Sequence, residues 1–259
     1  MSTQRQSRAR QLRWAGRAVV GVALCAITAS APAVDAESAK SVGTITYVDG
    51  TAYRAPGAAE SWAALAKESR LQQGDKLKTA AGARLEAKLH DGSLLRLGEN
   101  SQLNLDKVAV SRATPAKKKV KARLVIGRIW ASVTKLFGDD SEFEVVTTNA
   151  VAGVRGTRFA AETGADGSVV KVYSGKVLVS NKPVYQVEGH TKGKRVQVQG
   201  PQEITKQQWT DLVTGAMQQV RIASNGDMSP AETFAAAAPG GDDWEKWNTE
   251  RDALAGIKE

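Results

Sequence analysis

The segment of residues 147–159 constrains the fold more than any other stretch of this chain. It begins with β-branched residues, continues through small residues that include Gly153 and Gly156, and ends with an aromatic residue. Glycine permits positive φ angles and close approach of two backbones, so the pattern predicts a strand, a tight crossing and a second strand. Arg155 and Arg158 would carry fixed positive charge beside that crossing. Both arginines are candidate contacts for a partner, with solvated arginines beside a turn as the simpler interpretation.

Alternation of apolar and polar residues extends the β prediction along the chain. Apolar Leu85, Ala87 and Leu89 alternate with charged neighbours, which is typical of a strand with one buried face. The dipeptides Asp49-Gly50 and Asp91-Gly92 are tight-turn signals. Strands of about five to eight residues, with turn signals about every 8–12 residues, favour an all-β sandwich, a barrel or a short β-solenoid.

The pattern changes from strand to helix after Pro201. Residues 205–208 match a helix capping box, and the apolar residues that follow, as far as Val220, recur with helical spacing. The predicted order is therefore a β domain (residues 43–199), a packing helix (203–222), a linker (223–241) and a C-terminal helical tail (242–259).

The predicted tail carries two tryptophans, Trp244 and Trp247. A helix as short as this one is only marginally stable alone in water, so we expect another surface to hold it. The two indole rings either dock onto the β domain of the same chain or anchor a partner protein. We favour docking in the same chain, because two exposed tryptophans would promote aggregation.

Six short motifs, in this order, resemble those of FecR-type domains, the extracytoplasmic sensor modules of bacterial cell-surface signalling. They are VGTITYVDG (residues 42–50), GDKLKT (74–79), LHDGSL (89–94), GRIW (127–130), VRGTRF (154–159) and VKVYSG (170–175). The segment DWEKWNTERD (243–252) is also similar to the tail of exported FecR-domain proteins. The resemblance implies a FecR-like β-sandwich or short β-solenoid with a small helical C-terminal appendage. It does not specify a ligand.

The N-terminus resembles a cleavable signal peptide, residues 1–36. Five arginines precede an apolar run over residues 18–27, which is shorter than the roughly 20 residues that span a membrane. Small residues allow cleavage after Ala33 or Ala36, and an uncleaved anchor is the alternative. We therefore expect export to the periplasm, with no integral membrane span after cleavage. The segment before residue 18 is short for a sigma-binding region, so transmembrane signalling by this chain alone is not expected.

Cleavage would leave a modestly basic chain without cysteine. The full sequence has 36 Lys and Arg against 27 Asp and Glu, and loss of residues 1–36 leaves 31 against 26. Positive charge is concentrated in residues 107–123, a segment that contains no acidic residue. Lys117, Lys118 and Lys119 are adjacent there and are candidate contacts for an envelope polyanion, such as lipopolysaccharide phosphate or peptidoglycan carboxylates. A solvated loop is the simpler interpretation. Nucleic acid is not an expected partner, because aromatic residues are not interleaved with these lysines.

The sequence offers few residues for catalysis. Only His90 and His190 are present, each beside a turn signal, and we find no nucleophile, metal-ligand or phosphate-loop motif. We therefore expect no metal, no cofactor and no enzymatic activity. An envelope polysaccharide-active enzyme is the alternative, because a pair of catalytic carboxylates needs no fixed spacing.

The function predicted from these observations is that of a non-catalytic periplasmic sensor or scaffold module. Its expected partner is an envelope component or another exported protein, with a role in cell-surface signalling implied by the resemblance. A basic structural protein that binds polyanions or peptidoglycan is a second alternative.

Overall fold

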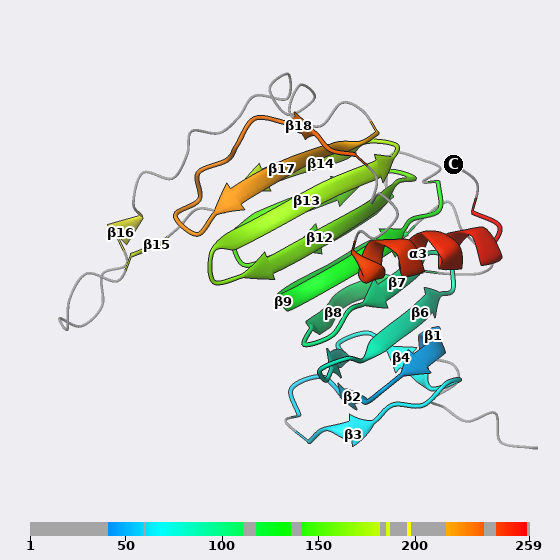
Figure 1. The fold of residues 1–259 in the computed structure, drawn as a ribbon. Coiled ribbons are helices and arrows are strands. Elements are labelled where there is room, and N and C mark those ends of the chain that lie inside the picture. The colour runs from blue at the N-terminus through cyan, green and yellow to red at the C-terminus, as the bar shows by residue number, and fades with distance from the viewer. Residues whose placement is uncertain are drawn as a thin grey trace, which may run out of the picture. The chain divides into compact units, whose positions relative to one another are not determined.

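A computed structural model describes residues 41–59, 61–110, 118–135, 141–181, 185–186, 196–197, 216–235 and 242–257. The chain divides into two units, residues 1–34 and 35–259, and every described residue lies in the second (Figure 1). The described elements are β1 (Ser41–Asp49), β2 (Ala52–Ala55), β3 (Ala63–Ala64), β4 (Arg70–Gln72), β5 (Lys76–Thr79), β6 (Arg84–Leu89), β7 (Leu94–Leu97), β8 (Gln102–Ala109), β9 (Lys119–Ser132), β10 (Glu142–Val146), β11 (Ala150–Val154), β12 (Arg158–Gly164), β13 (Gly167–Ser174), β14 (Val177–Asn181), β15 (Tyr185–Gln186), β16 (Val196–Gln197), β17 (Gln218–Ala223), β18 (Glu232–Thr233) and the helix α3 (Asp243–Leu254).

Two sets of strands share the long strand β9. One set has the order β18-β17-β13-β12-β9-β7-β6-β1-β4, and the other joins β2, β3, β5, β8, β10, β11 and β14. All described pairings are antiparallel except that of β9 with β10. Side chains from both sets, among them Phe159 and Val172 on one and Val145 and Val179 on the other, form one buried apolar core. The all-β fold with a small C-terminal helix is therefore confirmed, in the form of a sandwich.

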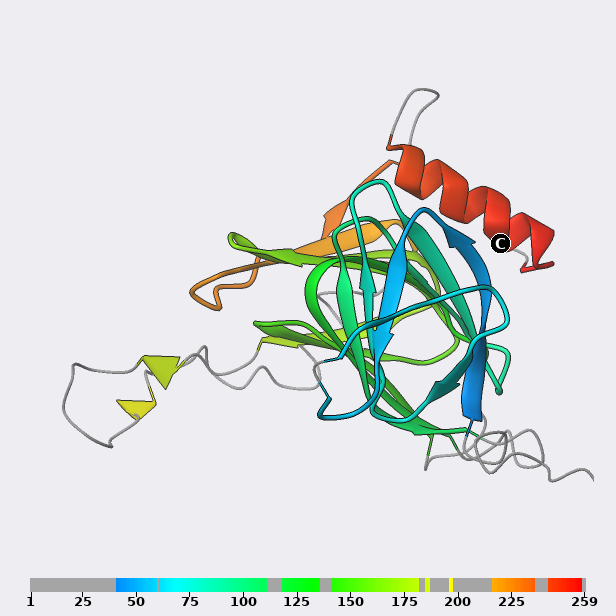
Figure 2. The same cartoon turned by 90° about the horizontal axis from the view of Figure 1, so that it is seen from below.

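The alternation predicted for residues 85–89 is present in β6, but the outer face of this strand is partly covered, since Lys88 is exposed and Glu86 is not. Leu85, Ala87 and Leu89 point into the core, and Glu86 on the other face is also buried. All four residues of the next strand, β7, are buried as well. Figure 2 shows the reason, because α3 lies outside the strands and packs across this face.

Strand β9 changes partners at a glycine. Up to Ile126 it pairs with β8, and from Gly127 onward it pairs with β12, while β7 joins it from Ile129. Gly127 has φ +89°, a conformation that L side chains rarely adopt, and a Cβ there would lie 2.6 Å from the Cα of Ser101. The Ser101 hydroxyl accepts a hydrogen bond from the Arg128 backbone N–H at 2.9 Å. This bend lets one strand belong to both layers.

The C-terminal part of the predicted packing helix is a strand. Residues 203–215 lie outside the described residues, but residues 218–222 belong to β17, which pairs with β13. The helical prediction was wrong here because Val220 and Ile222 alternate with polar neighbours and fill the core from the open edge of β13. Asn149 fixes this edge from the turn after β10, donating from Nδ2 to the carbonyl oxygens of Ile222 (2.9 Å) and Ala223 (2.6 Å).

The other boundaries shift accordingly. The β domain begins at Ser41 and takes in β17 and β18, so the range 43–199 was too short and part of the predicted linker is strand. Residues 236–241 of that linker and the predicted signal peptide lie outside the described residues. The predicted tail contains α3, which Asp242 caps by accepting the Trp244 backbone N–H. In the described part of the chain, no helix has the length and apolar character needed to cross a membrane.

The bend at Gly127 gives a first prediction. Gly127→Ala should lower the free energy of unfolding by at least about 2 kcal/mol, because the new methyl group collides with Ser101 and the residue is held at positive φ. Gly164→Ala is the matched control, since no heavy atom lies within 4 Å of a Cβ at that position, and it should change stability by less than about 1 kcal/mol. Urea unfolding monitored by tryptophan fluorescence measures both. Equal effects of the two substitutions would contradict this account of the bend.

Candidate interaction surfaces

Three connections meet at the turn that the sequence marked as a tight crossing. Residues 155–157 join β11 to β12, residues 175–176 join β13 to β14, and residues 133–135 follow β9. Gly156 has φ +61°, and a Cβ there would lie 3.0 Å from the Cα of Lys135. Gly175 has φ +86°, and its Cβ would lie 2.9 Å from the Gly156 carbonyl oxygen. Both glycines are therefore required by close backbone packing.

Thr157 ties the three connections together. Its hydroxyl is buried and donates a hydrogen bond to the Lys176 carbonyl oxygen at 2.8 Å. Its own carbonyl oxygen accepts from the backbone N–H of Val133 at 3.0 Å. The predicted strand, crossing and strand are thus present, and the crossing is a tight turn held by hydrogen bonds to both neighbouring connections.

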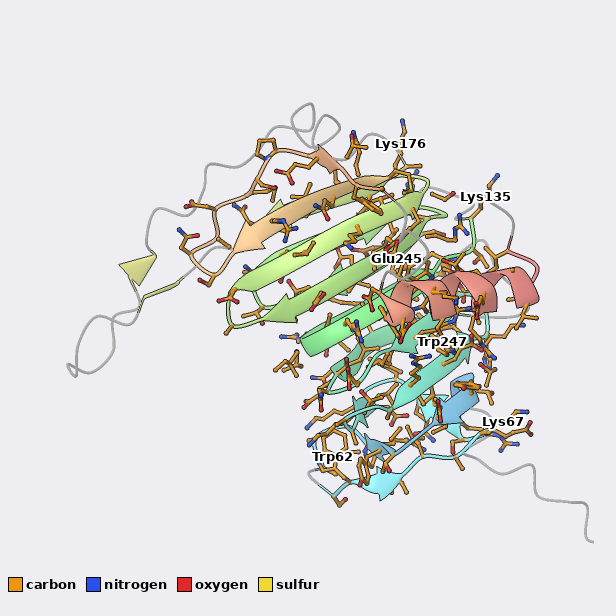
Figure 3. All side chains as sticks on the ribbon, viewed as in Figure 1. Trp62, Lys67, Lys135, Lys176, Glu245 and Trp247 are labelled. Carbon is orange, nitrogen blue, oxygen red and sulfur yellow. The ribbon has the colours of Figure 1, made fainter. Side chains whose placement is uncertain are left out.

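Four cations surround this turn: Lys135, Arg155, Arg158 and Lys176. We call this set the basic turn cluster. Lys135, Arg155 and Lys176 are exposed, and Arg158 is half-buried at the start of β12. Lys135 and Lys176 extend from the same end of the strands (Figure 3). None of the four forms an ion pair with a carboxylate of the described residues. Among the described residues, the cluster is therefore a group of cations without a carboxylate partner.

The adjacent lysines do not form one surface. Lys117 lies outside the described residues, and Lys119 is exposed at the start of β9. Lys118 is only 1% exposed, and its ammonium donates to Asp91 Oδ2 at 2.6 Å and to Thr134 Oγ1 at 2.7 Å. This burial excludes Lys118 from the expected polyanion surface. The alternation of inward and outward residues along the strand would have predicted this burial, because residue 118 lies on the same inward face as residues 120, 122 and 124.

Asp91, the partner of Lys118, belongs to the predicted Asp-Gly turn. Burial alone would raise the pKa of this carboxyl group, but hydrogen bonds from Lys118 and Ser93 and the charge of Lys118 outweigh it and lower the pKa. The Asp91–Lys118 pair therefore joins the turn after β6 to the start of β9 as a buried ion pair.

The tail helix α3 docks onto the β domain of the same chain. Trp244 is 5% exposed and Trp247 is half-buried. The two rings stack with centroids 5.3 Å apart, and Trp247 contacts the ring of Tyr47 at 5.6 Å. Arg128 lies over the Trp244 ring, with its guanidinium 5.3 Å from the ring centroid. Of the two alternatives for the tryptophans, the structure shows docking within the chain.

A charge quartet lies between the helix and the sheet; it consists of Glu86, Arg96 and Asp252, which are buried, and Arg251, which is half-buried. Arg96 and Asp252 are fully buried, and Arg96 Nη1 donates to Asp252 Oδ1 at 2.6 Å. Asp252 also accepts from Trp130 Nε1 at 3.0 Å and from Ser132 Oγ at 2.9 Å. Two cations and two carboxylates cancel in charge, so the quartet is neutral overall.

Glu86 completes the quartet from the outer face of β6. It accepts from Arg96 Nε at 2.7 Å, Arg251 Nη2 at 2.7 Å and Thr46 Oγ1 at 2.6 Å. Burial alone would raise the pKa of Glu86, but the hydrogen bonds from Arg251, Thr46 and Arg96 outweigh it and lower the pKa from 4.5 to about 2. The carboxylate is therefore ionised over the whole neutral range.

Sequence reasoning did not find this quartet. Arg251 and Asp252 were visible in the tail motif, but nothing in the pattern named their partners. One signal was available, since Arg96 interrupts the apolar run of residues 94–97. A charged residue inside a strand with two covered faces requires a buried counter-ion.

The residues considered for metal binding and catalysis are dispersed. No group of three or more His, Cys, Asp or Glu converges as a metal site among the residues that the structure describes. His90 is half-buried beside the Asp91 turn, and His190 lies outside the described residues.

The charge quartet yields a prediction for the tail. Asp252→Asn keeps the shape of the side chain but leaves one uncompensated positive charge in the quartet, so it should lower the free energy of unfolding by about 3 kcal/mol. Glu250→Gln, an exposed position on the same helix, is the control and should have almost no effect. Thermal unfolding followed by circular dichroism measures both. A melting temperature unchanged by Asp252→Asn would show that α3 does not stabilise the β domain.

The low pKa of Glu86 predicts acid sensitivity. A carboxyl group whose pKa is lower in the folded than in the unfolded state stabilises the folded state at every pH above the unfolded-state pKa. For Glu86 this stabilisation amounts to about 3 kcal/mol and is lost as the pH falls from 4.5 towards 2. Glu86→Gln should be less stable at neutral pH and should lose less stability on acidification than the wild type. Glu162→Gln, an exposed carboxylate, should keep the wild-type slope. Urea unfolding at a series of pH values tests this, and parallel curves for Glu86→Gln and wild type would contradict it.

Comparison with known proteins gives a match to one family model and a similarity to solved structures. The model of the family described as FecR protein matches residues 75–178. A search of curated proteins gives no match. Two crystal structures of a protein provisionally described as an anti-sigma factor from Parabacteroides distasonis ATCC 8503 are similar, with TM-scores of 0.41 and sequence identities of 16% and 14%. Each alignment covers 62% of this chain and 60% of the other, so this chain spans about three fifths of that protein's length. The family match confirms the resemblance read from the sequence motifs: over residues 75–178 this chain is similar to FecR-type domains.

Proposed function

We propose that this protein is a non-catalytic recognition module of the bacterial cell envelope, exported to the periplasm, where it binds an envelope component or an exported protein. The observation that carries the proposal is the FecR family match over residues 75–178. FecR-type domains are extracytoplasmic sensor modules, and the resemblance of this chain to them supports a role in signalling or regulation. The signal-peptide pattern of residues 1–36 supports export.

The geometry of the basic turn cluster supports recognition. Its side chains project from turns that are fixed by backbone contacts at Gly156, Thr157 and Gly175. A rigid backbone leaves mainly side-chain freedom to be lost on binding, which favours affinity and specificity. Functional loops on a rigid β scaffold are a common arrangement in binding proteins.

The tail contributes to this function indirectly. Trp244 and Trp247 are engaged with Tyr47 and Arg128 in the same chain, so we assign them to stability rather than to partner contact. The exposed candidates among the predicted contacts are then Arg155 and Lys119, with Arg158 half-buried.

Capture and turnover measured on the same preparation test the proposal. Immobilised protein should retain a specific component of a periplasmic extract, and an excess of the free protein should prevent this retention. The same preparation should show no turnover of peptidoglycan or of envelope glycans. Turnover that disappears when a single carboxylate is changed would establish the enzyme alternative and contradict the proposal.

The exported location has an independent test. Protein recovered from the periplasmic fraction should have the intact mass of a chain that begins after Ala33 or Ala36. A full-length mass, with the protein in the membrane fraction, would instead indicate an uncleaved anchor.

A further inference from the structure

The basic turn cluster combines positive charge with the absence of a counter-ion in the described structure. Some exposed or half-buried cations elsewhere in the described chain are paired, as Arg123 is with Asp106 at 2.6 Å, whereas others, such as Lys67 and Arg221, have no carboxylate partner among the described residues. Lys135, Arg155 and Lys176 have no such partner there although three backbone segments hold them near one another. Like charges brought together repel, so an arrangement of this kind gains stability when an anion joins it.

Arg158 adds a guanidinium to this cluster at the start of β12. Its Nε is buried and has no hydrogen-bond partner among the described residues, so a ligand would contact the half-buried side chain through its terminal Nη groups. A guanidinium offers directed hydrogen-bond donors as well as charge, which suits an oxyanion.

We propose that the basic turn cluster binds a phosphate group of a phosphate-bearing envelope component, an inference that rests on the proposed function and names its ligand class. A phosphomonoester carries a charge of about −1.5 to −2 and three acceptor oxygens, so it matches several cations better than a single carboxylate does. The arginines supply planar pairs of donors suited to phosphate, and the lysines supply point charges. The source of the phosphate is a lipid headgroup or a soluble phosphate compound.

Two charge-matched triple variants test the proposal. Lys135→Gln, Arg155→Gln and Lys176→Gln together remove the exposed cations of the cluster. Lys67→Gln, Lys107→Gln and Arg221→Gln remove three exposed cations elsewhere and produce the same change in net charge. All six positions are exposed, so both variants should keep the wild-type melting temperature.

Binding is measured by co-sedimentation with phosphatidylcholine vesicles that contain phosphatidic acid, and by calorimetry with inorganic phosphate. Wild-type protein should bind at least one of the two probes. The cluster variant should bind about a hundredfold more weakly, since each cation near an anionic surface contributes about a factor of five. The control variant should bind like the wild type. Binding to vesicles but not to inorganic phosphate identifies a lipid headgroup, and the reverse identifies a soluble source.

Arg158→Lys separates donor geometry from charge. It keeps the positive charge but removes the guanidinium, so it should weaken phosphate binding by about tenfold if Arg158 donates to the ligand. Unchanged binding would show that only charge matters at this position and would contradict the role given to the guanidinium.

Three results would overturn the proposal: no binding of either probe by the wild type, equal weakening in both triple variants, or binding unchanged in the cluster variant. Failure of the ligand class is distinguishable from failure of the proposed function. If the phosphate probes do not bind but the protein still retains a specific periplasmic component, the module is a recognition module for another ligand. If neither is observed, the proposed function fails as well.

Discussion

The ion pair between Arg96 and Asp252 is the contact on which the arrangement of this structure depends most. Arg96 lies in the centre of a sheet, on a strand whose four residues are all buried. A guanidinium in that position is tolerated only when a counter-ion is buried with it. Asp252 supplies the charge from α3, and Trp130 and Ser132 fix the carboxylate from β9. The helix is therefore part of the fold of the β domain rather than an attachment to it.

The same contact explains why the helix packs through polar residues. The buried positions of α3 are Trp244, Glu245, Asn248 and Asp252, not a stripe of aliphatic side chains. Aliphatic packing tolerates small rotations of a helix, whereas paired hydrogen bonds to Arg96 and Glu86 permit a single register. Aromatic rings flank these charges, with the Arg251 guanidinium 4.6 Å from the ring centroid of Tyr47 and that of Arg96 6.0 Å from the ring centroid of Trp247.

Much of the fold was predictable because strand alternation and turn chemistry are local. Leu85, Ala87 and Leu89 lie on the inward face as predicted, and the crossing at Gly156 is where the glycines placed it. The prediction of helix at the end of residues 203–222 was wrong because, over so few residues, Val220 fits both the helical and the strand spacing of apolar residues. Pairing with the free edge of β13 makes this segment a strand. Pairings between distant residues were not predictable. Nothing near Lys118 in sequence reveals Asp91, and nothing near Arg96 reveals Asp252, since each partner is chosen by the tertiary structure.

The separation of Arg96 from Asp252 also determines when the fold can be completed. Their contact spans 156 residues, and α3 is the last described element of the chain. A growing chain can pair β6 with β7, and Arg96 with Glu86, long before Asp252 has been made. Without the helix, Arg96 lacks its second carboxylate and the indole N–H of Trp130 lacks its acceptor. The last described element of the chain therefore completes a polar network whose other members are made much earlier.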